Sequence, residues 1–352
     1  MSGEESPTAP SAKRSKVSND VTCETVNLNQ WLHKTSSHLK RLPLIDLRPK
    51  EDFEKRHLRK DLSTIVNLPF SDLISGERSC ELPPRNTEFA LLVPAQIDGK
   101  EIEDFFFATT SKATLQSRKP WLVRQIIQET SEFWKEAKRL EIMSNSSSGV
   151  QSLPMPRLWK PDQMVEHKLL PMLKDRLENS NKNENIVIWD LGSGAGRDVC
   201  FLAEELMCSV GTQEEEGFTS TIRVVGFDNH KGSPRRSAPL WKNRMVHDST
   251  ESRLVNLKKL ELLEENIKKE SNLVCMYAIR YLNRRMLECI ATQTALKAGC
   301  IFAISHFCKE EGVEWNWDHP KVRPRSHLIF EVPAAFLTSF FCSQAASSKG
   351  MN

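Results

Sequence analysis

Residues 185–207 read NIVIWDLGSGAGRDVCFLAEELM, and this stretch decides the fold. It opens with an apolar, β-branched run at 186–189, which is typical of a buried parallel strand. Further along, apolar residues recur at helical spacing, so one face of a helix is predicted to pack on the sheet. Three alternating glycines, Gly192, Gly194 and Gly196, separate the two elements. The stretch therefore predicts a strand, a glycine-rich turn and a helix.

The glycines and the next strand together indicate a ligand site. Alternating glycines let the chain turn sharply out of a strand and let a ligand approach bare backbone at a helix N-terminus. The next predicted strand, 221–228, ends in Asp228. An acidic residue at the tip of a second strand can accept hydrogen bonds from two ribose hydroxyls. The separation of Gly192 from Asp228, 36 positions, exceeds the roughly 20 of the dinucleotide pattern, and a predicted insertion loop at 211–220 accounts for much of the excess.

Two cofactors compete for this loop, a nicotinamide dinucleotide and S-adenosylmethionine. The dinucleotide fingerprint requires a third glycine where Arg197 stands. The loop instead reads hhxDxGxGxGR, in which Asp190 can meet a charged amino group of the ligand or order the loop. This segment closely resembles motif I of class I S-adenosylmethionine-dependent methyltransferases, especially the small-molecule-type members with a GxGxGRD run.

The resemblance implies a set of cofactor-binding residues. Asp228 matches the acidic residue that these enzymes use for the ribose, and Asp248, in MVHDST, falls where a third-strand acidic residue flanks the adenine. The implied S-adenosylmethionine site therefore comprises Asp190, Gly192, Gly194, Gly196, Asp228 and Asp248. No residue receives a catalytic assignment, although four lie near the implied methyl-transfer side: Tyr277, Tyr281, His306 and Cys308.

The resemblance covers residues 154 to about 307 and implies a Rossmann-like domain with a mainly parallel sheet. A fourth strand with its loop is expected at 272–282, and a helix, a glycine turn and a fifth strand at 295–307. After Phe307 only two apolar runs remain, HLIFEV and FLTSFF, with no long helix before the second. A shortened or altered C-terminus is therefore expected, and it leaves the acceptor side of the site undefined.

The N-terminal half predicts a second, smaller α/β unit. Residues 43–70 read as a strand, a turn, a helix and a strand. This stretch closely resembles the opening of rhodanese-like domains, and 88–93 and 121–128 supply further elements. The residues that carry the resemblance are Asp46, Arg48, Glu51, Phe53, His57, Leu58, Asn67 and Pro69.

Active rhodanese-like domains need a cysteine just after the strand that corresponds to 88–93. Here Pro94, Ala95 and Gln96 follow that strand, and no cysteine lies between Cys80 and Cys200. Sulfur transfer through the usual nucleophile is therefore excluded. Cys80 precedes the strand, so it could act as the nucleophile only in an active site of different geometry. The domain is predicted to be a regulatory, substrate-presenting or docking module that binds a protein partner.

The domain organisation follows from these segments. We expect a disordered tail at 1–37, the rhodanese-like domain at 38–143, a Ser/Gly/Pro linker at 144–153 and the methyltransferase domain at 154–342. The nine cysteines form no CxxC pair, so no metal site is predicted, and the N-terminus has no apolar signal core. A cytoplasmic location is expected. A short basic cluster in SAKRSK, at 11–16, would serve as a nuclear address.

Composition limits the partners. Hydrophobic residues at 39% and charged residues at 27% exclude a disordered or fibrous chain. A net charge of +3 is too balanced to indicate nucleic-acid binding by itself, and no apolar stretch is long enough to cross a membrane. One basic cluster is the local exception: Arg235, Arg236, Lys242 and Arg244.

The sequence thus predicts a methyltransferase that acts on a small-molecule acceptor, with a non-catalytic rhodanese-like domain. The alternative is a non-enzymatic regulatory or interaction protein built on degenerate domains of both kinds.

Overall fold

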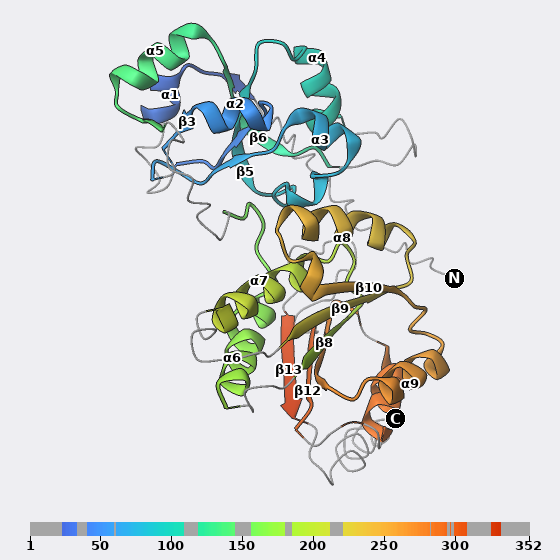
Figure 1. Cartoon of the computed structure of the whole chain (residues 1–352). Coiled ribbons are helices and arrows are strands. Elements are labelled where there is room, and N and C mark those ends of the chain that lie inside the picture. The colour runs from blue at the N-terminus through green and yellow to red at the C-terminus, as the bar shows by residue number, and fades with distance from the viewer. Residues whose placement is uncertain are drawn as a thin grey trace, which may run out of the picture.

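The computed structural model places two α/β units along the chain (Figure 1). It describes residues 23–33, 41–59, 61–108, 119–144, 156–179, 185–211, 221–281, 283–293, 296, 299–307 and 325–331. The predicted α/β class with mainly parallel sheets is confirmed. Within these ranges no helix combines the length and the apolar character that crossing a membrane requires.

The N-terminal unit is built on a five-stranded sheet in the order β1-β6-β5-β2-β4, with all neighbours parallel. Its strands are β1 (Glu24–Thr25), β2 (Leu44–Asp46), β4 (Ile65–Asn67), β5 (Glu88–Val93) and β6 (Leu122–Gln128). The short strands β3 (His57–Leu58) and β7 (Met143–Ser144) form a separate antiparallel pair. The strands expected near 44, 65, 88 and 122 are therefore present.

Helices cover both faces of this sheet, and each face has its own apolar core. One core includes residues of α3 (Phe70–Ser75) and α4 (Gly99–Ile102), and the other includes residues of α1 (Leu28–His33) and α5 (Ser131–Arg139). The remaining elements are the helix α2 (Lys50–Lys55), the 3-10 turn η1 (Ser79–Glu81) and the π-helical segment η2 (Glu103–Phe107).

The predicted disordered tail at 1–37 is wrong for residues 23–33. Strand β1 pairs with β6, and helix α1 follows it. The side chain of Trp31 is fully buried, together with Val26 and Leu28. These apolar groups repay the entropy of ordering a segment that is too short to show periodicity. Residues 1–22, with the basic cluster, and most of the predicted linker lie outside the described residues.

The C-terminal unit is built on a six-stranded sheet in the order β10-β9-β8-β11-β12-β13. Its strands are β8 (Ile186–Leu191), β9 (Ile222–Asp228), β10 (Thr250–Leu254), β11 (Leu273–Ile279), β12 (Ile301–Phe307) and β13 (Arg325–Glu331). All neighbours are parallel except β12 and β13, which are antiparallel. The HLIFEV run thus closes the described sheet, and FLTSFF lies outside the described residues.

Two layers of helices enclose this sheet. On one face lie η3 (Val165–Leu169), α6 (Leu170–Asn179), α7 (Arg197–Gly211) and α8 (Gly232–Asn243), and on the other lie α9 (Leu260–Lys269) and α10 (Arg284–Thr292) (Figure 1). A 3-10 turn, η5 (His247–Ser249), precedes β10. The helix expected from 295 falls mostly on residues outside the described ranges, and the described helix before β12 is α10. Gly299 precedes β12 at a φ of 80°.

Candidate functional site

The strand order of the C-terminal sheet reverses at β8. Strand β9 pairs with one edge of β8 and β11 with the other. In open parallel sheets the connections diverge at such a point and leave a crevice outside the carboxyl ends of the strands, where ligands bind. The glycine loop lies at the end of β8, with Asp228 and Arg280 at the ends of the neighbouring strands.

All three glycines of the loop have positive φ: 94° at Gly192, 59° at Gly194 and 70° at Gly196. Side-chain-bearing residues rarely adopt this conformation. Backbone hydrogen bonds fix the loop, since the Gly192 amide donates to the Phe227 carbonyl at 2.8 Å and the Gly196 amide donates to the Ser193 carbonyl at 2.9 Å. The predicted turn is therefore a rigid one.

The three glycines face different surroundings. A Cβ atom at Gly192 would lie 2.9 Å from Cβ of Tyr281, and one at Gly196 would lie 2.8 Å from Cζ2 of Trp241. A Cβ atom at Gly194 would meet nothing within 4 Å. Gly192 and Gly196 thus permit close packing inside the protein, whereas Gly194 borders open space.

Asp228 supports the loop from the end of β9. Its Oδ2 accepts a hydrogen bond from the Gly194 amide at 2.8 Å, and its Oδ1 accepts one from the His230 amide at 2.7 Å. Each carboxylate oxygen retains a second lone pair. The structure therefore brings two predicted residues, Asp228 and Gly194, into direct contact and leaves Asp228 able to accept from a ligand hydroxyl.

Asp190 lies beneath the loop, at the end of β8. It is register partner to Tyr277 on β11, and both side chains are buried. Oδ1 of Asp190 and the hydroxyl of Tyr277 make no well-aligned hydrogen bond to any described residue, and the two groups interact with each other. Burial, to which the charge of Asp198 adds and which the interaction with Tyr277 opposes, raises the pKa of Asp190 well above its usual range. Asp190 and Tyr277 thus form a buried polar pair under the loop.

Asp198, in the first turn of α7, is a second carboxyl group near the loop, and it is partly buried. It accepts a hydrogen bond from the Asp162 amide at 2.8 Å. Burial raises its pKa to about 6, with the charge of Asp162 adding to the shift and those of Arg280 and Arg197 opposing it. In the sequence, Asp198 is distinguished only as the last residue of the GxGxGRD run, in the first turn of the helix that follows the glycines.

The structure does not bring Asp248 to the other predicted residues. Its side chain is 89% exposed and lies before β10, at the amino end of that strand. The ligand crevice is expected at the carboxyl ends of the strands, so Asp248 lies at the opposite ends of the strands, away from the crevice. Asn256 lies two residues beyond the end of β10, at the carboxyl end of that strand.

The end of β11 contributes further residues that the sequence analysis did not assign. Arg280 has a φ of 57°, unusual for a residue other than glycine, and its amide donates to the Ser305 carbonyl at 2.6 Å. Tyr281 packs against Gly192. Tyr277, in contrast, is fully buried beneath the crevice. Strained backbone of this kind concentrates at functional sites.

The predicted basic cluster divides in the structure. Arg235, Arg236 and Lys242 are exposed on α8, whereas Arg244 is buried and donates from Nε to Glu204. Three cations, not four, therefore face solvent at this place.

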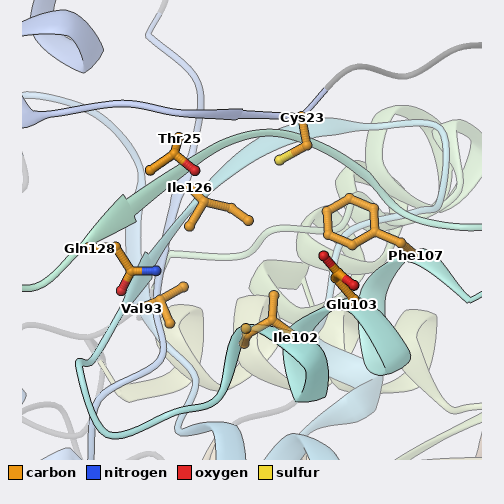
Figure 2. A pocket seen from close by; sticks show the side chains of 9 residues that line it. Cys23, Thr25, Val93, Ile102, Glu103, Phe107, Ile126 and Gln128 are labelled. Atoms are coloured by element: carbon orange, nitrogen blue, oxygen red, sulfur yellow. The ribbon is translucent and has the colours of Figure 1, made fainter.

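The N-terminal unit holds a separate cavity of about 450 Å³ beside β1, β5 and β6 (Figure 2). Val93, Ile102 and Phe107 form part of its wall, and the Cys23 side chain also lines it. Burial raises the pKa of the Cys23 thiol. Cys80, which does not line this cavity, is buried, and burial raises the pKa of its thiol as well. Neither group has the features of an activated nucleophile.

No protein-family model and no curated protein matches the chain. Solved structures match parts of it at low similarity. An RNA methyltransferase from Salinibacter ruber in complex with S-adenosyl-L-homocysteine is 18% identical, with a TM-score of 0.27, over 46% of this chain and 91% of that one. An S-adenosylmethionine-dependent methyltransferase from Mesorhizobium loti is 17% identical, with a TM-score of 0.27, over 42% of this chain and 55% of that one.

The [4+2]-cyclase SpnF is similar at the same level, with 15% identity and a TM-score of 0.27 over 40% of this chain and 46% of that one. The chain thus matches about half of the length of two of these three structures.

Proposed function

We propose that the chain is an S-adenosylmethionine-dependent methyltransferase that acts on a small-molecule acceptor. The observation that carries the proposal is the glycine loop, which is open at Gly194 and held by Asp228 at the point where the parallel sheet reverses its strand order. Arg197 stands where a dinucleotide fingerprint has glycine, which favours S-adenosylmethionine over a nicotinamide cofactor.

The residues present fit this cofactor. Bare backbone at Gly194 leaves room for the ligand, and Asp228 has lone pairs for the ribose hydroxyls. The Asp190 carboxyl, beneath the loop at the end of β8, would meet the charged amino group of the cofactor. Asn256 offers an amide for the adenine. S-adenosylmethionine, when bound, supplies a methyl group activated by a sulfonium.

The chain's own contribution is orientation and exclusion of water. Direct displacement of a methyl group needs an acceptor held in line with the breaking bond, and a rigid site provides that alignment. The hydrogen-bonded glycine loop provides rigidity on one side. Tyr281, packed against Gly192 at the end of β11, forms part of the wall on the other side.

We further propose that the N-terminal unit is a rhodanese-like domain without sulfurtransferase activity, in a cytoplasmic protein with access to the nucleus. Its parallel sheet contains the expected strand, helix and strand, and Arg48 pairs with Asp46 inside it. Pro94, Ala95 and Gln96 follow β5 in place of a cysteine loop. Such a module would dock a protein partner.

Titration calorimetry with S-adenosylhomocysteine and, separately, NAD⁺ tests the cofactor proposal. We expect one site for S-adenosylhomocysteine with micromolar affinity and no measurable heat with NAD⁺. Binding of NAD⁺ alone would refute the methyltransferase proposal. Binding of neither ligand would favour the alternative of a non-enzymatic interaction protein.

The affinity for S-adenosylmethionine is expected to depend on pH. A cation in the crevice favours the ionised form of Asp198, whose pKa is about 6 without ligand. Binding therefore lowers that pKa, and protonation opposes binding as the pH falls below 6. We expect roughly tenfold weaker binding at pH 5 than at pH 7.5.

Asp198→Asn is the control for this pH dependence, because the amide can still accept from the Asp162 amide. The variant should bind more weakly at pH 7.5 and lose most of the change between pH 5 and pH 7.5. An unchanged pH profile in the variant would assign the effect to another group, such as Asp190, whose pKa burial also raises.

A small-molecule acceptor predicts weak binding of nucleic acid. Only three members of the basic cluster face solvent on α8, too few for an extended phosphate contact. We expect labelled RNA and DNA to bind only in low salt and without an effect of Arg235→Ala. Tight, strongly salt-dependent RNA binding that Arg235→Ala and Arg236→Ala abolish would instead indicate a nucleic-acid methyltransferase.

A further inference from the structure

The glycine loop of the C-terminal unit is tied directly to the N-terminal unit. Arg197, which follows the last glycine and begins α7, donates from Nε to the Cys80 carbonyl and from Nη2 to the Leu82 carbonyl, both at 2.9 Å. These acceptors lie 117 and 115 positions earlier in the chain. Burial lowers the pKa of Arg197. The Arg197 side chain therefore forms hydrogen bonds that join the two units.

The surroundings of these hydrogen bonds are closely packed. Cys80 belongs to the apolar core of the C-terminal unit, with Trp159 and Trp241. Leu158, in the segment just before α6, belongs to a core of the N-terminal unit. The two units therefore share buried side chains in both directions, and η1 contacts α8 near the start of α7.

Hydrogen bonds extend from this interface into the N-terminal sheet. Nε and Nη2 of Arg78 donate to the two carboxylate oxygens of Glu81, each at 2.7 Å, and Nη1 donates to the Asn67 carbonyl at 2.9 Å. The Asn67 side chain in turn donates to the Asp46 carbonyl at 3.0 Å. On the other side, Nδ2 of Asn243 donates to Glu81 at 3.3 Å. The carboxyl end of the N-terminal sheet is thus connected to α8.

The same helix holds the glycine loop. The indole Nε1 of Trp241 donates to the Gly196 carbonyl at 3.0 Å, and the ring occupies the space where a Gly196 side chain would lie. Gly196 is therefore held by Trp241 on one side and by the Arg197 anchor on the other. Gly194, which borders the open crevice, lies only two residues away.

We propose that Arg197 is a positioning residue through which the N-terminal unit sets the geometry of the cofactor loop. The N-terminal unit is then a structural part of the cofactor site and not an independent attachment. The effect on cofactor affinity rests on the proposed function. The effect on the loop itself does not, since these hydrogen bonds join atoms of the chain alone.

Arginine suits this position because one planar fork reaches two carbonyl groups at fixed angles. A lysine keeps the charge but replaces the planar fork by one ammonium nitrogen on a flexible stem, so the two carbonyls are no longer held at fixed angles. The looser geometry weakens the hydrogen bonds to the Cys80 and Leu82 carbonyls at the junction of the two units, next to the loop.

Arg197→Lys in the full-length chain tests the proposal with two readouts besides activity. We expect amide exchange at Gly196 and Cys200 to become at least about fivefold faster without ligand, and S-adenosylhomocysteine affinity to fall about fivefold. The urea unfolding midpoint should change little. Arg124→Lys is the matched control, because Arg124 pairs with Glu88 on the partly exposed surface of the N-terminal sheet.

A second variant, Arg78→Lys, tests coupling, because Arg78 has no hydrogen bond to the glycine loop among the described contacts. We expect about a twofold to threefold faster exchange at Gly196, and an effect that is not additive with Arg197→Lys. Additive effects, or unchanged exchange in Arg197→Lys, would overturn the proposal. If wild-type protein binds no S-adenosylhomocysteine, the proposed function fails, yet the exchange data still decide the role of Arg197.

Discussion

Replacement of Gly194 by valine is expected to abolish binding of S-adenosylmethionine. Gly194 has a φ of 59° and borders open space, so the new side chain would project into the crevice and not into the protein. A β-branched residue also strains this backbone by roughly 1–2 kcal/mol. Together with the loss of ligand space, the change should weaken binding on the order of 100-fold. Calorimetry with S-adenosylhomocysteine measures the effect.

Gly194→Ala separates the two causes. Alanine imposes a similar backbone strain but adds only one carbon atom, so we expect an intermediate loss of affinity. Circular dichroism and urea unfolding should show both variants folded, because no protein atom lies within 4 Å of the new Cβ. Wild-type affinity in Gly194→Val would show that the ligand does not approach this part of the loop.

The fold of the C-terminal unit was predictable because its signals are local. An apolar strand, three glycines and an amphipathic helix follow one another within 185–207, and the sheet positions them as expected. Asp228 was predictable for the same reason, since a strand end can be identified from the pattern.

Asp248 was misplaced because the third strand begins later than expected. Four of its five residues, Thr250–Leu254, are polar, and none of the five is buried, so no apolar run marks the strand in the sequence. Without such a run, Asp248 was taken for a residue of the third strand, although it precedes the strand at its amino end. The carboxyl end, with Asn256, becomes evident only from the parallel register of β10 with β9.

The contacts between the two units could not be predicted from the sequence. Arg197 reads as part of a cofactor motif, and nothing near Cys80 or Leu82 marks their carbonyls as its acceptors. The burial of Trp31 was missed in the same way, because the core that covers it comes from β6 and α5. Both features depend on residues about 100 positions apart.

Asp228→Ala is expected to cause the second largest loss of cofactor affinity. The change removes the acceptor for the Gly194 and His230 amides, at 2.8 and 2.7 Å, and also the acceptor proposed for the ribose hydroxyls. Hydrogen bonds to a charged acceptor contribute about 1.5–3 kcal/mol, so we expect roughly 30-fold weaker binding of S-adenosylhomocysteine. Calorimetry with adenosine alone should show a similar ratio, because both ligands carry the ribose.

Asp248→Ala is the matched control for Asp228→Ala, since it removes an acidic side chain of the same size from the amino end of a strand and not from the carboxyl end. We expect wild-type affinity in this variant and a severalfold loss in Asn256→Ala, which lies at the carboxyl end of β10. The opposite pattern, with Asp248→Ala weakened and Asn256→Ala unchanged, would contradict the placement of the crevice at the carboxyl ends of the strands. The affinities of the two variants therefore show at which end of the strands the cofactor binds, whatever reaction the protein catalyses.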